Sequence, residues 1–124
     1  MKEIMIATSN AHKVEEFREM LEPLGFQVRS LLDLNEQIEI EETGTTFAEN
    51  AMIKAETVHA RLGIPVISDD SGLEVDAMDK APGVYSARFL GYDTAYEVKN
   101  QFIMDQVKGK TRSARYVCAI AYVE

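Results

Sequence analysis

The sequence predicts a three-layer α/β domain in which helices cover both faces of a mixed sheet. Short apolar runs typical of buried strands alternate along the chain with segments whose apolar residues recur at helical spacing. No internal repeat, low-complexity tract or Pro/Gly/Ser-rich linker interrupts the 124 residues. A chain of this length can bury one core but is too short for two. We therefore expect residues 1–124 to form a single domain.

The N-terminal part of the chain contains a strand, a helix and a second strand. The apolar run at residues 4–7 predicts a buried strand. A helix is expected after Thr8, Ser9 and Asn10, and Gly25 ends it before a second strand at residues 26–31. One face of this helix is apolar, and that face consists of Val14, Phe17, Leu21 and Leu24.

The middle of the chain predicts a longer helix followed by a third strand. The acidic stretch 35–46 has no apolar stripe at helical spacing, and such a stripe begins only with the next residue. Its members are Phe47, Ala51, Ala55, Val58 and Leu62. Gly63 and Pro65 end this helix. Val66 and Ile67 then predict a buried strand, which we expect to end in Asp69 and Asp70.

The C-terminal part predicts a short strand at 73–75, a turn at 81–83, a helix from Asp93 or Thr94 to about Val107, and a long last strand. That last strand, residues 113–123, is apolar on both faces, as in the centre of a sheet. No later segment can pair with it, which indicates either a truncated protein or an edge covered by a partner chain. Cys118 lies within the strand and is expected to be a packed core thiol.

Composition excludes several classes of function. The net charge is −8, from 13 basic and 21 acidic residues, which argues against a basic surface for polynucleotides. No apolar run approaches the roughly 20 residues that a membrane span needs, and no signal or transit peptide is visible. The single cysteine cannot form a disulfide within the chain. We therefore expect a reducing, cytoplasmic setting without membrane or polynucleotide partners.

The first strand–helix junction, Thr8-Ser9-Asn10, is a candidate phosphate site. Free backbone N–H groups and the positive end of the helix dipole favour anions there. The alternative is that Ser9 or Asn10 simply caps the helix. Lys13 favours the phosphate hypothesis, because a cation in the first turn opposes the dipole at a cost of roughly 0.3–1 kcal/mol that a bound anion would remove. The glycine patterns of P-loop and Rossmann sites are absent.

Lys54 is the second lysine of interest, because it lies on the flank of the apolar stripe of its helix and not on the opposite face. Asn50 and Arg61 share this flank. Two interpretations stay open: the lysine extends along the core edge to reach solvent, or it binds a ligand.

Two pairs of carboxylates are candidate metal ligands. Glu41 and Glu42 precede a probable turn, and Asp69 and Asp70 follow a buried strand. Mg²⁺ prefers oxygen ligands, commonly one or two carboxylates with waters and phosphates. The alternative for the aspartates is an Asx turn leading into Ser71. Ligands of α/β sheets bind at the carboxyl ends of strands, so one crevice could hold both the aspartates and the Thr8 junction.

Five ordered segments resemble the family of non-canonical purine NTP pyrophosphatases, the inosine triphosphate pyrophosphatase or Ham1-like proteins. The resemblance extends over residues 4–123. The segments are Ala7-Thr8-Ser9-Asn10-Ala11-His12-Lys13, Glu42-Thr43-Gly44-Thr45-Thr46-Phe47-Ala48-Glu49-Asn50-Ala51, Ser68-Asp69-Asp70-Ser71-Gly72-Leu73, Ala81-Pro82-Gly83-Val84-Tyr85-Ser86-Ala87-Arg88-Phe89 and Ala114-Arg115-Tyr116-Val117-Cys118.

The resemblance implies an α/β fold with a long mixed sheet and a cleft between two lobes. It also implies Mg²⁺-dependent hydrolysis of inosine, deoxyinosine and xanthosine triphosphates to monophosphate and pyrophosphate, commonly by a homodimer. Glu42, Asp69 and Asp70 would hold the metal, and Asp70 would also orient or deprotonate the attacking water. The implied substrate-binding residues are Thr8, Ser9, Asn10, Ala11, His12, Lys13, Lys54 and Ser71.

The resemblance fails at the C-terminus. Members of the family continue with a Phe-Gly-Tyr-Asp-Pro segment, a lysine and a Ser-His-Arg motif that shape the base pocket, and this sequence lacks them. We therefore expect a C-terminally truncated form of the fold, and two alternatives stay open. The first is a nucleotide-binding or oligomerising remnant with little or no turnover. The second is a Maf-like pyrophosphatase, whose opening Leu-Ala-Ser-x-Ser-Pro-Arg-Arg motif fits residues 7–13 poorly.

Overall fold

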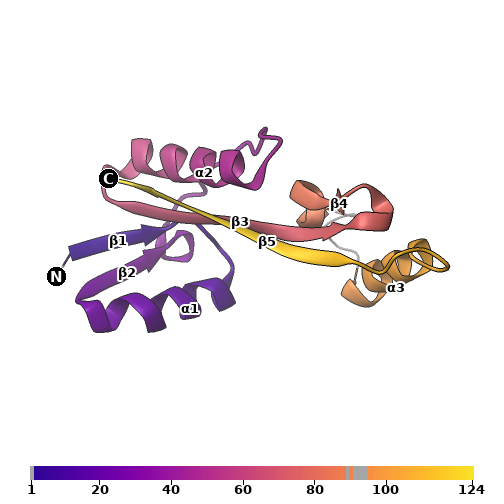
Figure 1. The fold of residues 1–124 in the computed structure, drawn as a ribbon. Coiled ribbons are helices and arrows are strands. Elements are labelled where there is room, and N and C mark those ends of the chain that lie inside the picture. Colours follow the sequence, from indigo (N-terminus) through magenta and orange to yellow (C-terminus); the bar gives the residue numbers. More distant parts are fainter. Residues whose placement is uncertain (1, 89, 91–94) are drawn as a thin grey trace. The chain divides into compact units, whose positions relative to one another are not determined.

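The computed structural model describes residues 2–88, 90 and 95–124 (Figure 1). By its internal contacts the chain divides into two compact units. The first unit comprises Met1–Asp69 and Ala119–Glu124, and the second comprises Asp70–Cys118. The single domain expected from the sequence stays a prediction.

The described residues of the first unit include all or part of four strands, together with two α-helices. β1 pairs in parallel with β2, from Lys2↔Phe26 to Ile6↔Ser30, and with β3 at Met5↔Val66 and Ile6↔Ile67. β5 also pairs with β3. The complete elements of the unit are β1 (Lys2–Ile6), α1 (Ala11–Leu21), β2 (Phe26–Ser30) and α2 (Phe47–Leu62). Parts of β3 (Val66–Val75) and β5 (Ala114–Val123) also fall within it. Two short 3₁₀ helices follow α1 and β2, namely η1 (Glu22–Leu24) and η2 (Leu31–Asp33).

The alternation of side chains along β1 creates a core on each face of the sheet. Ile4 and Ile6 are buried with Val28, and Phe17 and Leu21 of α1 pack against them. Met5 and Ala7 point the other way, because successive strand residues face opposite sides, and they are buried with the α2 residues Ala51, Ala55 and Val58. α1 and α2 therefore cover opposite faces (Figure 1), which confirms three layers in this unit.

α1 ends earlier than its apolar pattern suggests. Pro23 has no N–H with which to continue the helix, and the chain passes into η1 and then into Gly25, whose φ of 92° is left-handed. Leu24 is consequently 71% exposed, so its predicted place on the buried face is wrong. α2 has the predicted bounds, because Thr46 caps its first turn and Gly63 ends it in a left-handed conformation.

β3 runs without interruption through Asp69 and Asp70. The predictions that these residues end a strand and that residues 73–75 form a separate one are wrong, as is the Asx-turn alternative. Asp, Ser and Gly disfavour strands, but pairing and tertiary contacts override local preference. Both aspartates are 7% exposed, so the strand buries the two carboxylates that the sequence suggested as metal ligands.

The second unit begins with the rest of β3. This part pairs antiparallel with β4 (Ala81–Pro82) at Glu74↔Pro82 and Val75↔Ala81, which makes the sheet mixed, as predicted. The predicted turn at 81–83 is thus a short strand that leads into the 3₁₀ helix η4 (Gly83–Arg88). A further 3₁₀ helix, η3 (Asp76–Met78), α3 (Tyr96–Gln106) and the first part of β5 also belong to the unit. The predicted caps Asp93 and Thr94 lie outside the described residues, and Ala95 is the N-cap of α3.

β5 is apolar on both faces in sequence, but only one face is buried. Ala121 is 6% exposed and belongs to the core beneath α2, against which Ala119 and Val123 pack. Tyr116 is 82% and Ile120 65% exposed. Cys118 is also exposed, so its predicted burial as a core thiol is wrong. No helix among the described residues has the length and apolarity needed to cross a membrane.

Candidate functional site

The segment after β1 is organised by its own side chains. Thr8 Oγ1 accepts a hydrogen bond from the Asn10 amide at 3.1 Å. Asn10 Oδ1 accepts from the amides of His12 at 3.0 Å and Lys13 at 3.4 Å. The capping hypothesis is therefore confirmed for Asn10, whereas Ser9 and Ala11 are exposed. The side chains of Thr8 and Asn10 therefore accept hydrogen bonds from backbone amides at the start of α1.

The parallel register of β1 and β3 brings Asp69 level with this segment. β1 ends at Ile6, opposite Ile67, and β3 continues beyond it. Asp69 lies two residues after Ile67, and Thr8 lies two residues after Ile6. Asp69 thus lies level with Thr8, just beyond the end of β1, although its own strand continues.

Lys13 bridges α1 and β3. Its Nζ lies 2.8 Å from Asp69 Oδ2, and the two side chains are 32% and 9% exposed. The ion pair joins residues 56 positions apart. It also explains how a lysine is tolerated in the first turn of a helix, because the buried carboxylate offsets the unfavourable dipole.

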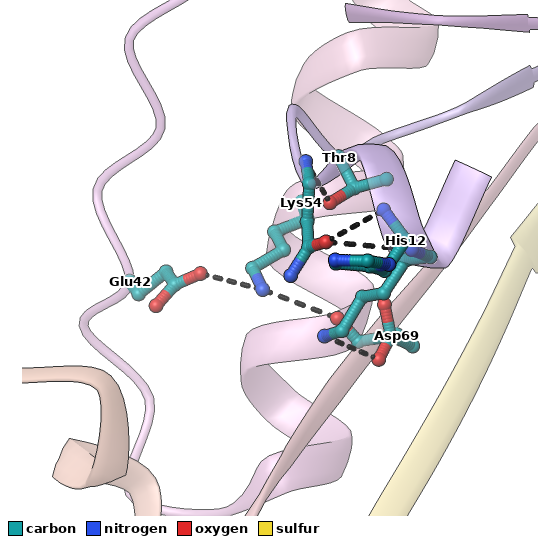
Figure 2. A network of polar contacts seen from close by, with 7 residues as sticks. Thr8, His12, Glu42, Lys54 and Asp69 are labelled. Carbon is teal, nitrogen blue, oxygen red and sulfur yellow. Dashed lines mark hydrogen bonds and ion pairs between the residues drawn. The ribbon is translucent and has the colours of Figure 1, made fainter. Parts of the chain in front are cut away.

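Lys54 reaches the same aspartate from α2. Its Nζ donates to the Asp69 carbonyl oxygen at 3.1 Å and lies 2.7 Å from Glu42 Oε1 (Figure 2). The Lys54 side chain is 17% exposed and that of Glu42 29% exposed. The interpretation that Lys54 extends into solvent is therefore wrong, because its ammonium group ends in a polar cluster.

These contacts form one continuous network in the first unit, as Figure 2 shows. It runs from the Thr8 segment through Lys13, Asp69 and Lys54 to Glu42. Two lysines therefore converge on one aspartate, one through its carboxylate and one through its carbonyl. The seven members are Thr8, Asn10, His12, Lys13, Glu42, Lys54 and Asp69.

The sequence predicted Asp70 and Ser71 as further site residues. Asp70 is buried and Ser71 half-buried at the start of the second unit, and their predicted roles stay predictions. Arg61 shares the Lys54 flank of α2 but binds Glu36 with two hydrogen bonds of 3.1 and 2.7 Å. That guanidinium lowers the pKa of the Glu36 carboxyl, mainly through the hydrogen bonds.

Asn50 lies on the same flank of α2 as Lys54, and the sequence pattern predicts no role for it. Asn50 is fully buried, and its Oδ1 accepts a hydrogen bond from the Gly44 amide at 2.8 Å. The contact fastens the irregular segment that carries Glu42 to the first turn of α2. An asparagine on the edge of an apolar stripe is the signal that could have revealed it, because buried amides need partners.

The carboxylates of the network suit a hard cation whose coordination is completed by other ligands. Among the described residues, no three His, Cys, Asp or Glu side chains are grouped closely enough to hold a metal by themselves. Mg²⁺ needs only one or two carboxylates when waters and phosphates supply the rest. Glu42 fits this role because it is partly exposed and bonded through one oxygen, Oε1. A centre shared by Glu42, Asp69 and Asp70 stays a prediction.

The fold and the network together define an α/β protein with lysines and carboxylates clustered where β1 ends beside β3. The match to a family model is specific: the Ham1 family model matches residues 4–124. The chain therefore belongs to the Ham1 family, and the resemblance found in the sequence motifs is confirmed.

Curated relatives are similar over almost the whole chain. A dITP/XTP pyrophosphatase of Exiguobacterium sp. is 53% identical over 118 residues, which are 94% of this chain and 60% of that protein. One of Bacillus licheniformis is 51% identical over 98% of this chain and 63% of the relative. The chain thus spans about three fifths of the length of these relatives.

Solved structures show the same fold. A HAM1 protein from Coxiella burnetii superposes with a TM-score of 0.91 at 36% identity, covering all of this chain and 64% of that one. The Staphylococcus aureus Ham1 protein gives a TM-score of 0.87 at 36% identity, covering 98% of this chain and 63% of that one. The predicted fold class is confirmed.

Proposed function

We propose that this protein hydrolyses non-canonical purine nucleoside triphosphates, such as dITP, ITP and XTP, to monophosphate and pyrophosphate with Mg²⁺. One observation carries the proposal: Lys13 and Lys54, from opposite layers of the first unit, converge on Asp69 beside a helix start. The names of the relatives, dITP/XTP pyrophosphatase, support the substrate class.

Each side chain of the network has a role in this proposal. The Thr8–Lys13 segment and Lys54 bind the triphosphate, and the two ammonium groups neutralise the departing pyrophosphate. Glu42, Asp69 and Asp70 hold Mg²⁺, which, when bound, polarises phosphate oxygens. Asp70 orients or deprotonates the attacking water, and Ser71 contacts the substrate.

The direct test measures pyrophosphate release from dITP, ITP and XTP with Mg²⁺, beside ATP and GTP. Asp70→Asn keeps the size of the side chain and removes its charge, so we expect release to fall by about a hundredfold or more. Ala48→Ser, at an exposed position of α2, is a control that should retain activity. Turnover that Asp70→Asn leaves unchanged would contradict the assigned role.

A second candidate is a nucleotide-binding protein with little or no turnover. Binding of phosphates by Lys13 and Lys54 does not by itself require hydrolysis. Calorimetric titration with ITP beside the pyrophosphate assay separates the two proposals, since binding without release supports only the second.

We also propose self-association as a homodimer through β5, and a cytoplasmic setting. Tyr116 and Ile120 on this strand are exposed, and apolar strands tend to pair with other chains. Ile120→Lys should then weaken association in sedimentation velocity, and a monomer at every concentration would contradict the proposal. The proposal of a cytoplasmic setting is based on the single cysteine, because disulfide-rich chains are typical of oxidising compartments.

A further inference from the structure

The segment that carries Glu42 has no regular secondary structure, yet it is fastened to α2 at a defined point. Residues 41–44 belong to no helix or strand. The Gly44 amide donates to Asn50 Oδ1 at 2.8 Å, and the Thr45 amide donates to Glu49 Oε2 at 3.3 Å. Of the two acceptors, Asn50 is fully buried and Glu49 is exposed.

Close packing reinforces the Gly44 contact. A Cβ on Gly44 would lie 2.7 Å from Asn50 Oδ1 and 2.7 Å from Glu49 Cβ, closer than real side chains approach. Only glycine therefore lets this backbone lie against the first turn of α2. Any side chain at this position would push the segment away from the helix.

The Gly44 and Glu42 contacts lie on successive turns of α2. Gly44 meets Asn50 and Glu42 meets Lys54, so two residues of the segment correspond to four residues of α2. Four helical residues are about one turn of α2. The Thr43 amide donates to the Glu41 carbonyl oxygen at 3.1 Å, so a tight turn is centred on Glu42. The Gly44 contact therefore sets where Glu42 lies beside Lys54.

Asn50 is a costly residue for this place. Its Nδ2 is buried and has no hydrogen-bond partner among the described residues. An unsatisfied buried donor disfavours folding, so the hydrogen bond to Gly44 is the contact that the Asn50 amide gains at this place.

We propose that Asn50 is a positioning residue for the cation: it holds Glu42 in place through the Gly44 amide without touching substrate or metal. The inference rests on the proposed function, in which Glu42 binds Mg²⁺. Loss of the contact releases the segment, so Glu42 samples many positions and binds the cation less often. Removal of such supporting contacts lowers metal affinity by about 10- to 100-fold.

The test disrupts the contact from both sides. Asn50→Ala removes the acceptor, and Gly44→Ala introduces the clash while keeping Asn50. We measure Mn²⁺ affinity of the 124-residue chain by electron paramagnetic resonance, and exchange of the residue 44 amide by NMR. Both variants should bind Mn²⁺ about 10- to 100-fold more weakly, and Asn50→Ala should speed exchange at Gly44. Val58→Ala, in the core beneath the same helix, controls for lost stability and should keep wild-type Mn²⁺ affinity.

Wild-type Mn²⁺ affinity in Gly44→Ala, or in a folded Asn50→Ala with faster exchange at Gly44, would overturn the proposal. An equal loss of affinity in Val58→Ala would also overturn it, because general destabilisation would then explain the effect. Failure of the proposed function is a separate result, since wild-type protein would then bind Mn²⁺ but release no pyrophosphate from dITP.

Discussion

At the scale of single residues, the lysines and carboxylates of the network neutralise one another. Lys54 pairs with Glu42, and Lys13 pairs with Asp69. In the proposed function the carboxylates bind a cation and the lysines bind a triphosphate. Binding of the cation breaks the ion pairs and releases the lysines for the triphosphate, and binding of the triphosphate releases the carboxylates for the cation. Metal and nucleotide should therefore strengthen each other's binding, and the coupling must be reciprocal.

Lys54→Met tests this competition. Without the ammonium group, Glu42 is available to the cation, so Mn²⁺ alone should bind up to about fivefold more tightly, as expected for a partly exposed ion pair. Binding of ITP without metal should weaken. Arg61→Met breaks an ion pair on the same helix that lies outside the network, and it should change neither affinity. Weaker Mn²⁺ binding in Lys54→Met would contradict the competition.

The Glu36–Arg61 pair provides a prediction for pH. Hydrogen bonds from Arg61 lower the pKa of the Glu36 carboxyl. The pair therefore stabilises the fold above the ordinary glutamate pKa, and this contribution disappears as the pH falls through the lowered value. In Arg61→Gln, an NMR titration should return the pKa of Glu36 to its ordinary range. An unchanged low pKa would show that another group causes the shift.

At the scale of elements, the bounds of a helix or strand are predictable where the local sequence signals agree with the packing of the fold. α2 has a cap, a continuous apolar stripe and a terminal glycine, and its bounds were predicted correctly. β3 was predicted as two pieces, because Asp69-Asp70-Ser71-Gly72 resembles a turn. The pairing that carries the strand through these residues involves distant segments of the chain, which no local window contains.

The two cores on the faces of β1 lead to a prediction about the free energy of unfolding. Met5 is 1% exposed in the core beneath α2, whereas Met20 on α1 is 57% exposed. Met5→Ala should lower the free energy of unfolding by about 2–5 kcal/mol, because it removes buried methylenes and leaves a cavity. Met20→Ala should change it by less than about 0.5 kcal/mol. Urea denaturation measures the free energy of unfolding of both variants. An equal loss in the two variants would contradict the burial of Met5 beneath α2 and the exposure of Met20 on α1.

At the scale of the whole molecule, the sequence revealed which residue types carry the chemistry but not how they pair. Lys13, Lys54, Glu42 and Asp69 were all predicted site residues. Their pairing joins segments up to 56 residues apart and depends on the register of β1 and β3. Likewise, the exposure of Cys118 depends on how much of β5 the neighbouring elements cover, and the apolar pattern of the strand does not indicate this.

The most direct test of the account is the product ratio from dITP. With Mg²⁺, the protein should release pyrophosphate and deoxyinosine monophosphate in equal amounts, and Lys13→Met should abolish most of this release because it removes a phosphate ligand. Chelation of the metal should stop the reaction in wild-type protein. Orthophosphate as the product, or no metal-dependent release of pyrophosphate from dITP, ITP or XTP, would contradict the account.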